Sequence, residues 1–434
     1  MMDDNLVAPL SNLIDIKHGY PFPSRYFTDV PTDYILLTPG NFTKDQRLSF
    51  EQNITYYDGP IPDGFILDSG DLLIVMTDLA TDMVILGNAV VLPPCGLNRK
   101  ILHNQRIGKV IDKDRPANRT FLMYLLNSHA VHKEIRITAT GSTVRHTSPA
   151  KILNAMVWAP GITEQQRIAD ILSQWDHVIS LMERLIAAKR QRRKALAQKL
   201  LSGKRRFPKF IGSAIKIQDP CPTEWDYPRI GEIARPVAKR NKKGDRLPVL
   251  SCTKYQGLVD SFHYFSRERT GRNLFAYKRV RHGTFVYATN HIEEGSIGYQ
   301  DLYDEALVSP MYTAFETCDR IHDGFLYLVL KTERYRRIFA INTNASVDRR
   351  GGLRWGEFAK IRVPLPSLAE QEAITRVFTI ADREIELLQR QLAALWQQKK
   401  GLMQKLFTGW VRVGDSKQGW QSFAQNRQSM TRHR

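Results

Sequence analysis

The chain contains few cysteines, and none of them lies close to another. Its 434 residues include four, at Cys95, Cys221, Cys252 and Cys318. Structural zinc sites and disulfide frameworks depend on closely spaced cysteines such as the C-x-x-C pair. We therefore expect reduced thiols, with neither a zinc site nor a disulfide framework.

Long hydrophobic runs are also missing. The most apolar candidate for a membrane-spanning segment is interrupted by Asp68, Asp71, Asp78 and Asp82, whereas a spanning helix needs about 20 consecutive apolar residues. The first ten residues, MMDDNLVAPL, lack the basic start of a secretory signal. These absences predict a cytoplasmic protein that does not contact a membrane.

Motifs of nucleic-acid enzymes are absent as well. The sequence has no G-x-x-x-x-G-K-[ST] phosphate loop, no G-x-G-x-x-G turn, no H-E-x-x-H and no G-x-S-x-G. It also lacks the Asn-Pro-Pro-Tyr/Phe run of adenine methyltransferases. Two stretches contain suggestive histidines, HNQR at residues 103–106 and HIEEG at residues 291–295, but a lone histidine more often forms a structural hydrogen bond. We therefore expect no catalytic residue and no bound metal.

Acidic residues are outnumbered by basic ones. There are 44 Asp and Glu against 63 Lys and Arg, which gives a formal net charge of +19. Such a surplus favours a polyanionic partner such as DNA. Ten of the basic residues lie in residues 189–209, where they fit a solvated helix end equally well, because cations complement the helix dipole there.

One long segment occurs twice in the sequence. Residues 160–206 align without a gap with residues 366–412, and 18 of the 47 positions are identical. Two copies are too few for a solenoid, so a duplicated unit is indicated. Each copy ends at a matching helix-stop signal, Ser202-Gly203 or Thr408-Gly409.

Each copy has a stripe of core positions that repeats every 3.5 residues. Such a stripe predicts a helix packed along its length on a partner helix. We expect two helices of about 40 residues, roughly 60 Å long, that pair with each other; the alternative is that each packs only on its own domain. The stripe consists of Ile168, Leu172, Trp175, Ile179, Met182, Ile186, Lys189, Arg193, Leu196 and Leu200, and of Ile374, Phe378, Ala381, Ile385, Leu388, Leu392, Leu395, Lys399, Leu402 and Leu406.

The repeats divide the rest of the chain into two segments with a similar order of elements. Each contains a glycine before a strand-like run, a second β-prone stretch, a short apolar helix and a polar, basic loop. The strand-like runs are SGDLLIVMT at residues 69–77 and HGTFVYATN at residues 282–290; the loops cover residues 138–152 and 342–361. We therefore expect globules at residues 1–159 and 207–364, helices at 160–206 and 365–412, and a polar, disordered tail at 413–434.

This organisation resembles the specificity subunit of Type I restriction-modification enzymes. The helix openings APGITEQQRIADIL, at residues 159–172, and PLPSLAEQEAI, at residues 364–374, are similar to those of the family. The stretches LPVLSCTKYQGLVDS (residues 247–261) and ALVSPMYTAF (residues 306–315) are similar to parts of its recognition domains. YILLTPGNFTKDQRLS, at residues 34–49, departs from that pattern.

The resemblance implies an α+β fold with two mixed α/β target-recognition globules. The two long helices pair as an antiparallel coiled coil, and the halves are related by a pseudo-twofold axis. Each globule recognises one half of a bipartite target in double-stranded DNA, while the helices act as a spacer and dock two methyltransferase subunits. S-adenosylmethionine, ATP and Mg then belong to partner subunits, which include the restriction and motor subunits, and this chain itself is non-catalytic.

Residues that suit contact with DNA gather in the loops of both segments. Recognition in the major groove uses Arg for guanine and Asn or Gln for adenine, and basic side chains contact phosphates. The alternative function for the whole chain is that of a coiled-coil scaffold that binds nucleic acid without sequence preference. The candidates are Asn41, Thr77, Ser142, Thr143, Arg145 and His146 in the first segment, and Thr253, Lys254, Tyr255, Arg272, Lys278, Arg279, Asn290, Ser346, Arg349, Arg350 and Arg354 in the second.

Overall fold

The computed structural model divides the chain into two compact units. The first comprises Met1–Glu183 with Arg390–Arg434, and the second comprises Arg184–Gln389. The structure describes residues 7–51, 53–94, 99–113, 117–211, 225–265, 274–344 and 352–413. The predicted tail beyond residue 413 and the candidates Arg272, Ser346, Arg349 and Arg350 lie outside these residues, as do Cys95 and Cys221.

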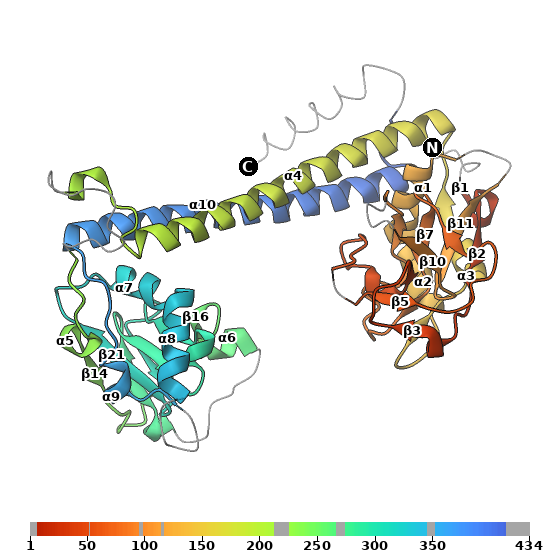
Figure 1. The fold of residues 1–434 in the computed structure, drawn as a ribbon. Helices are drawn as coiled ribbons and strands as arrows, with labels where there is room; N and C mark the ends of the chain where they lie inside the picture. The colour runs from red at the N-terminus through yellow and green to blue at the C-terminus, as the bar shows by residue number, and fades with distance from the viewer. Residues whose placement is uncertain are drawn as a thin grey trace, which may run out of the picture. The chain divides into compact units, whose positions relative to one another are not determined.

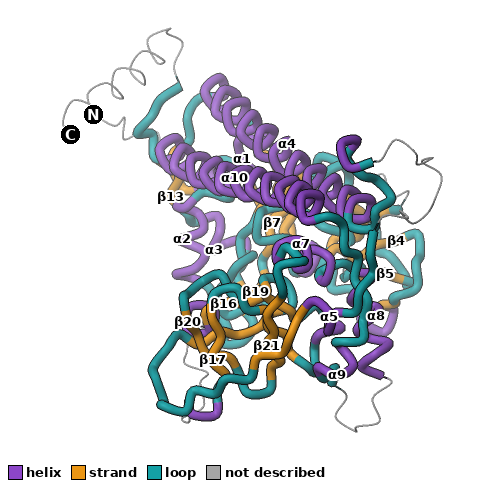
Figure 2. Tube along the Cα trace, turned by 90° about the vertical axis from the view of Figure 1, so that its left-hand side faces the viewer, coloured by secondary structure: helices purple, strands orange, loops and turns teal. Residues whose placement is uncertain are grey.

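Two long helices contribute to both units (Figure 1). Helix α4 covers Ile162–Leu200 and α10 covers Leu368–Phe407, with 39 and 40 residues. In the first unit Lys399 Nζ lies 2.5 Å from Asp176 Oδ1. In the second unit Arg193 Nη2 lies 2.7 Å from Asp382 Oδ2. Residue numbers rise along one helix as they fall along the other, so the predicted antiparallel pairing is confirmed; Figure 2 shows the helices side by side from a second direction.

The stripe predicted from the 3.5-residue repeat is the buried side of each long helix. Its members are buried or partly buried at every position of both copies. Even Lys399, a charged member of the stripe, is only 5% exposed. The buried positions, each less than 9% exposed, are Ile168, Leu172, Ile179, Ile186 and Leu200 in α4, and Ile374, Phe378, Ile385, Lys399 and Leu406 in α10.

The globule of the first unit contains two main sheets. One has the strand order β2-β11-β7-β9, and the other has the order β3-β5-β4-β10-β6. The first consists of β2 (Ile14–His18), β11 (Ile107–Asp112), β7 (Leu72–Val75) and β9 (Ala89–Val91), and the second of β3 (Phe27–Thr28), β5 (Thr55–Tyr57), β4 (Tyr34–Leu37), β10 (Lys100–His103) and β6 (Ile66–Leu67). Two short pairs are β1 (Val7–Pro9) with β13 (Met156–Trp158), and β8 (Thr77–Asp78) with β12 (Arg145–His146). The helices are α1 (Arg119–Leu126), α2 (His129–Thr138) and α3 (Pro149–Leu153).

The globule of the second unit also contains two sheets. Their strand orders are β14-β21-β18-β19 and β16-β15-β20-β17. The strands are β14 (Ala234–Val237), β21 (Tyr312–Thr317), β18 (Phe285–Ala288) and β19 (Ile297–Tyr299), then β16 (Gly257–Asp260), β15 (Val249–Thr253), β20 (Glu305–Val308) and β17 (Lys278–Arg281). The helices are α5 (Ile230–Ile233), α6 (Ser261–Phe265), α7 (Asp323–Leu330), α8 (Glu333–Asn344) and α9 (Trp355–Phe358).

The two globules share one topology. The order β2-β11-β7-β9 corresponds to β14-β21-β18-β19, and β5-β4-β10-β6 corresponds to β16-β15-β20-β17. In each second sheet one pair is parallel, β4 with β10 or β15 with β20, and its other corresponding pairs are antiparallel. The duplication seen in the helices therefore extends to the globules, and the predicted fold class is confirmed.

Each globule is closed by the start of one repeat and the end of the other. The core of the first unit includes the α4 start and the α10 end, and the core of the second includes the α10 start and the α4 end. The side chains are equivalent under the 206-residue offset. They are Ile168, Leu172, Leu406 and Phe407 in the first unit, and Ile374, Phe378, Leu200 and Leu201 in the second.

The Glu-Gln pair at each helix opening has a structural role. Gln165 Nε2 donates to the Pro160 carbonyl at 2.8 Å, and Gln165 Oε1 accepts from the Asn118 backbone N–H at 3.0 Å. Gln371 forms the same bonds with the Pro366 carbonyl at 2.8 Å and the His322 N–H at 2.7 Å. Because Asn118 and His322 are the N-cap residues of α1 and α7, each glutamine joins its long helix to its globule.

The glutamates of the same openings hold the ends of the opposite repeats. Arg412 Nη2 lies 3.0 Å from Glu164 Oε2, and Arg206 Nη2 lies 2.7 Å from Glu370 Oε2. Among the residues described, no helix is both long and apolar enough to cross a membrane.

Candidate nucleic-acid interface

The terminal loop of the first globule is a tight hairpin. The N–H of Thr140 donates to the His146 carbonyl and the N–H of His146 to the Thr140 carbonyl, both at 2.9 Å. Gly141 has φ +95°, and a Cβ there would lie 2.0 Å from the Val144 carbonyl oxygen, so only glycine fits. The turn leaves Ser142 and Thr143 exposed at its tip, where a ligand can reach both hydroxyls.

This hairpin lies against the strand end that carries Thr77. Strand β12 pairs with β8, so that Arg145 faces Asp78 and His146 faces Thr77, and Thr77 Oγ1 lies 3.1 Å from His146 Nδ1. The structure therefore brings together two residues that are 69 positions apart. Thr77 is only 4% exposed, so it supports His146 and is not itself available for DNA contact, contrary to our expectation.

Two polar atoms of the hairpin segment have no partner within the described residues. They are Arg145 Nε and Thr147 Oγ1, and both are buried. A buried donor without an acceptor costs about 1–3 kcal/mol, and such groups gather at sites that bind ligands. The hairpin therefore retains hydrogen-bonding capacity for a partner.

Asn41 does not belong to an exposed site. It is fully buried, and its Oδ1 accepts from the Thr38 N–H at 2.9 Å while its Nδ2 donates to the Ser49 carbonyl at 3.3 Å. Its side chain stabilises the 3-10 turn η4 (Pro39–Asn41). The prediction that Asn41 contacts DNA is therefore wrong.

The terminal loop of the second globule returns to the equivalent strand end. The N–H of Leu353 donates to the Thr289 carbonyl at 2.9 Å, just as the N–H of Thr147 donates to the Met76 carbonyl at 3.0 Å. The exposed Asn290 follows Thr289, and a Cβ on Gly352 would lie 2.7 Å from Asn290 Oδ1. This close approach places the loop beside Asn290.

Arg354 lies at the start of the short helix that follows this loop. It is exposed and is the N-cap residue of α9, as Ser148 is of α3. The other predicted residues of the loop, Ser346, Arg349 and Arg350, lie outside the described residues, so they stay predictions.

The turn between β15 and β16 presents Lys254 and Tyr255. Thr253 shapes it, because Thr253 Oγ1 donates to the Gly257 carbonyl at 3.0 Å and accepts from the Gln256 N–H at 3.1 Å. Tyr255 is 84% exposed, and Lys254 Nζ lies 5.6 Å from the centre of its ring. Thr253 therefore forms the turn, while Lys254 and Tyr255 are available to a partner.

A partly buried lysine, Lys331, fixes the position of this turn. Lys331 Nζ donates to the carbonyls of Lys254 at 3.0 Å and Gly295 at 2.9 Å. Burial lowers the pKa of Lys331. The turn is thereby joined to the segment that follows the 3-10 turn η7 (Ile292–Glu294).

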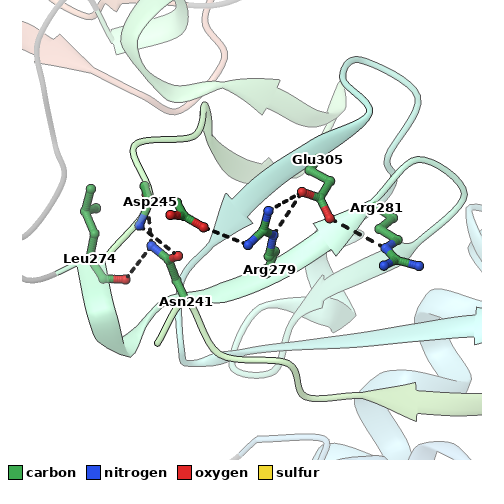
Figure 3. A network of polar contacts seen from close by, with 6 residues as sticks. All are labelled: Asn241, Asp245, Leu274, Arg279, Arg281 and Glu305. Atoms are coloured by element: carbon green, nitrogen blue, oxygen red, sulfur yellow. Dashed lines mark hydrogen bonds and ion pairs between the residues drawn. The ribbon is translucent and has the colours of Figure 1, made fainter. Parts of the chain in front are cut away.

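Arg279 and Lys278 are partly exposed, and both already have partners within the globule. Figure 3 shows Arg279 between two carboxylates, with Nη1 2.8 Å from Asp245 Oδ2 and Nε 3.0 Å from Glu305 Oε2. These carboxylates raise the pKa of the guanidinium, the hydrogen bond to Glu305 contributing most. Lys278 Nζ donates to the Tyr312 carbonyl, and burial lowers its pKa. These partners occupy both side chains, and their contact with phosphates stays a prediction.

One group among the described residues has the ligand types for a metal ion. The ligand atoms of His291, Glu293 and Glu294 lie within 4.8 Å of one another. His291 Nδ1 is already 3.3 Å from Glu294 Oε1, and Lys254 Nζ is 3.8 Å from Glu294 Oε2. The nearby lysine supplies part of the positive charge that a metal would bring.

The described cysteines are free, as expected. Cys318 is exposed and Cys252 is partly buried. Burial raises the pKa of the Cys252 thiol to about 12, so this thiol is protonated at neutral pH and is a poor nucleophile.

One basic surface was missed by the sequence analysis. Lys239, Arg240, Lys242 and Lys243 line a hollow of about 720 Å³ in the second globule. The run KRNKKGDR, at residues 239–246, was the signal that could have revealed it.

The chain matches a protein-family model and several known proteins. The model describes the Type I restriction modification DNA specificity domain and matches residues 222–397. The MjaVIII specificity subunit of Methanocaldococcus jannaschii is 22% identical over 73% of this chain and 76% of its own length. The EcoBI specificity subunit of Escherichia coli is 22% identical over 94% of this chain and 86% of its own length.

Solved structures share the fold over most of the chain. An S subunit of a Type I restriction-modification system from M. genitalium aligns over 94% of this chain and 98% of its own, with 16% identity and a TM-score of 0.50. A chain from a study of complex assembly in the Type I system aligns over 92% and 96%, with 14% identity and a TM-score of 0.55. In its duplicated helices, its paired globules and the match over residues 222–397, the chain is similar to Type I restriction-modification specificity subunits.

Proposed function

We propose that this chain is the sequence-specific DNA-recognition subunit of a Type I restriction-modification complex. The observation that carries the proposal is one topology used twice with different side chains at equivalent loops. The first globule presents Ser142, Thr143 and the Arg145–His146 strand, whereas the second presents Lys254, Tyr255 and Asn290. Two scaffolds of one shape with different contact residues suit a target made of two different half-sites.

These side chains are chemically suited to base edges in the major groove. Arginine donates two hydrogen bonds to guanine, and asparagine forms a pair of bonds with adenine. Arg145 and Asn290 are the residues to which we assign these roles, one in each globule. The neighbouring hydroxyls and the aromatic ring of Tyr255 supply further contacts to bases or backbone.

The paired helices act as the spacer between the two half-sites and as the docking surface for two methyltransferase subunits. Those subunits bring S-adenosylmethionine and take the target adenine out of the duplex, which modification of a base requires. Restriction and motor subunits, with ATP and Mg, complete the complex. This division of labour is supported by the similarity to this family.

The chain itself is non-catalytic in this proposal. This role is supported by the similarity to the specificity subunits of Type I enzymes. Incubating the purified chain with DNA and labelled S-adenosylmethionine tests the point. Methyl transfer by the chain without its partners would contradict it.

A competition binding assay distinguishes sequence recognition from a scaffold that binds any nucleic acid. The complex of this chain with its methyltransferase partners is bound to a labelled duplex selected from a random pool. Unlabelled selected and scrambled duplexes then compete at one stated salt concentration. We expect the selected duplex to compete at least 10³-fold better; equal competition would favour the scaffold.

A further inference from the structure

The loop that joins the two sheets of the second globule is short and strongly basic. Residues 238–248, AKRNKKGDRLP, connect β14 to β15. The loop adds to the open edge of β17, since the N–H of Arg279 donates to the Lys239 carbonyl at 2.7 Å and the N–H of Asn241 to the Tyr277 carbonyl at 2.9 Å. The backbone of the loop is therefore anchored to the sheet on both sides of Arg240.

Asn241 holds the loop in one conformation. It is 1% exposed, and its Nδ2 donates to the Asp245 carbonyl at 2.9 Å and to the Leu274 carbonyl at 3.3 Å (Figure 3). Its Oδ1 accepts from the Asp245 N–H at 3.1 Å. Gly244 has φ +71°, and a Cβ there would lie 2.7 Å from the Phe275 ring. The loop is thus shaped before any partner arrives.

The acidic groups nearest the loop are already neutralised. Asp245 and Glu305 both pair with Arg279, and Arg281 Nε lies 3.6 Å from Glu305 Oε1 (Figure 3). Five cations line the hollow, and Arg279 is the one that pairs with carboxylates; in the described part of the chain the other four form no ion pair. These cations are Lys239, Arg240, Lys242 and Lys243, and all four are exposed.

The first globule does not repeat this feature. The equivalent connection between β2 and β4 covers residues 19–33, GYPFPSRYFTDVPTD. It contains one basic residue, Arg25, and two aspartates. The fold itself therefore does not require a basic loop at this position. The positive charge of the loop in the second globule needs a separate explanation.

We propose that Lys239, Arg240, Lys242 and Lys243 bind backbone phosphates of double-stranded DNA, while Asn241 and Arg279 position them. Four cations around a hollow and without carboxylate partners match the chemistry of a phosphate chain. The proposal rests on the proposed DNA recognition and adds the surface with which the second globule holds the DNA backbone. Arg279 acts through the loop, because its guanidinium is occupied by Asp245 and Glu305.

The salt dependence of DNA binding tests this surface. The full chain is titrated against a fluorescent 30-base-pair duplex of scrambled sequence over a range of salt concentrations. Each lost phosphate contact lowers the slope of log K against log salt by about 0.9. We expect Lys242→Ala/Lys243→Ala to lower that slope by about 2 and the affinity roughly tenfold at moderate salt.

A matched variant distinguishes the effect of this surface on DNA binding from the effect of a lower net charge. Lys204→Ala/Arg205→Ala removes the same charge from exposed residues after α4. We expect this control to change the slope by less than half as much. Equal losses in the two variants, or no loss in the loop variant, would overturn the proposal.

The positioning role of Arg279 is tested by combining substitutions. If Arg279 acts through the loop, Arg279→Gln added to the double lysine variant lowers affinity much less than Arg279→Gln does alone, because the contacts are already lost. Fully additive losses would show that Arg279 contacts DNA by itself and would overturn its assignment. Thermal melts confirm that each variant is folded.

The test of the basic loop and the test of the proposed function can fail independently. The scrambled duplex reports phosphate contacts and does not require a target sequence. Competition by the selected duplex reports sequence recognition. Unchanged slopes with strong sequence preference would remove the loop proposal alone, and normal slope changes without preference would remove the recognition function alone.

Discussion

At the scale of single residues, the glutamines of the helix openings explain a sequence pattern in physical terms. Gln165 and Gln371 are almost fully buried, with exposures of 5% and 0%. Each uses both ends of its amide to satisfy a backbone group on either side of the junction between helix and globule. The Glu-Gln pair was visible in the sequence, but its partners Asn118 and His322 lie about 50 residues away and were not.

Gln371→Ala should lower the free energy of unfolding by about 1–3 kcal/mol. The substitution leaves the His322 N–H and the Pro366 carbonyl without their partner in a buried place. Urea denaturation measures the effect, with the exposed Gln191→Ala as the control. A loss no greater than that of the control would show that the junction does not depend on this amide.

The buried His103 and the partly buried His132 make the first globule sensitive to acid. Burial lowers the pKa of His103 and of His132 to about 4. In the unfolded chain a histidine has a pKa near 6.5, so the unfolded state binds protons first as the pH falls. Stability contributed by the neutral forms is therefore complete above about pH 6.5 and is lost between pH 6.5 and 4.

Denaturation at several pH values checks this window. His132→Phe should reduce the loss of stability between pH 7 and pH 5, whereas the exposed His177→Phe should leave it unchanged. The full effect of one such histidine is at most about 3 kcal/mol. If the wild type and both variants lost the same stability between pH 7 and pH 5, groups other than His132 would be the cause.

At the scale of elements, the two repeats carry equivalent ion pairs of unequal burial. Lys399 and Arg193 occupy the same stripe position, and they pair with Asp176 and Asp382. The Lys399 side chain is 6% exposed and that of Arg193 is 31% exposed. Tyr124 donates to Asp176 at 2.5 Å, so the first pair belongs to a larger buried network.

Lys399→Met should destabilise the chain more than Arg193→Met. Removing one partner of a buried pair leaves the other charge without its counter-ion. Because Asp176 is 35% exposed, we expect the free energy of unfolding to fall by only about 1–3 kcal/mol. For the more exposed Arg193–Asp382 pair we expect about 1 kcal/mol or less. Urea denaturation compares them, and Asp176→Asn in the Lys399→Met background should recover part of the loss. A larger cost at Arg193 would contradict the difference in burial.

The long helices could be predicted from the sequence because their pattern continues for about 40 residues. The shared topology of the globules could not, since most strands have only two to six residues and give little periodicity. The carboxylate partners of Arg279 could not be predicted for a related reason. Its partners Asp245 and Glu305 are 34 and 26 residues away, so the sequence showed the cation without the carboxylates that neutralise it.

At the scale of the whole molecule, the chain uses one globule topology and one long helix twice. Both the helix contacts and the globule topology repeat. The loops do not repeat: the connection at residues 238–248 is basic, and its counterpart at residues 19–33 is aromatic and acidic. The two globules therefore share a scaffold and differ in these loops.

Lengthening both helices should lengthen the gap between the half-sites. One heptad inserted near Arg184 and another near Arg390 preserves the stripe and adds about 10 Å to each helix. At about 3.4 Å per base pair, the preferred spacer should grow by roughly three base pairs, less what bending of the DNA absorbs. A four-residue insertion in α4 alone should disrupt the pairing. Target selection from a random pool measures the spacer, and an unchanged spacer in the heptad variant would show that the helices do not set it.

The most direct test of two-part recognition is to map methylation sites for the complex with its partner subunits. The wild-type chain should direct methylation to one bipartite sequence with a fixed spacer. Ser142→Ala/Thr143→Ala/Arg145→Ala should relax the requirement in one half-site, while the other half-site and the spacer stay the same. Methylation without any sequence preference, or equal relaxation of both half-sites, would contradict the assignment of one half-site to each globule.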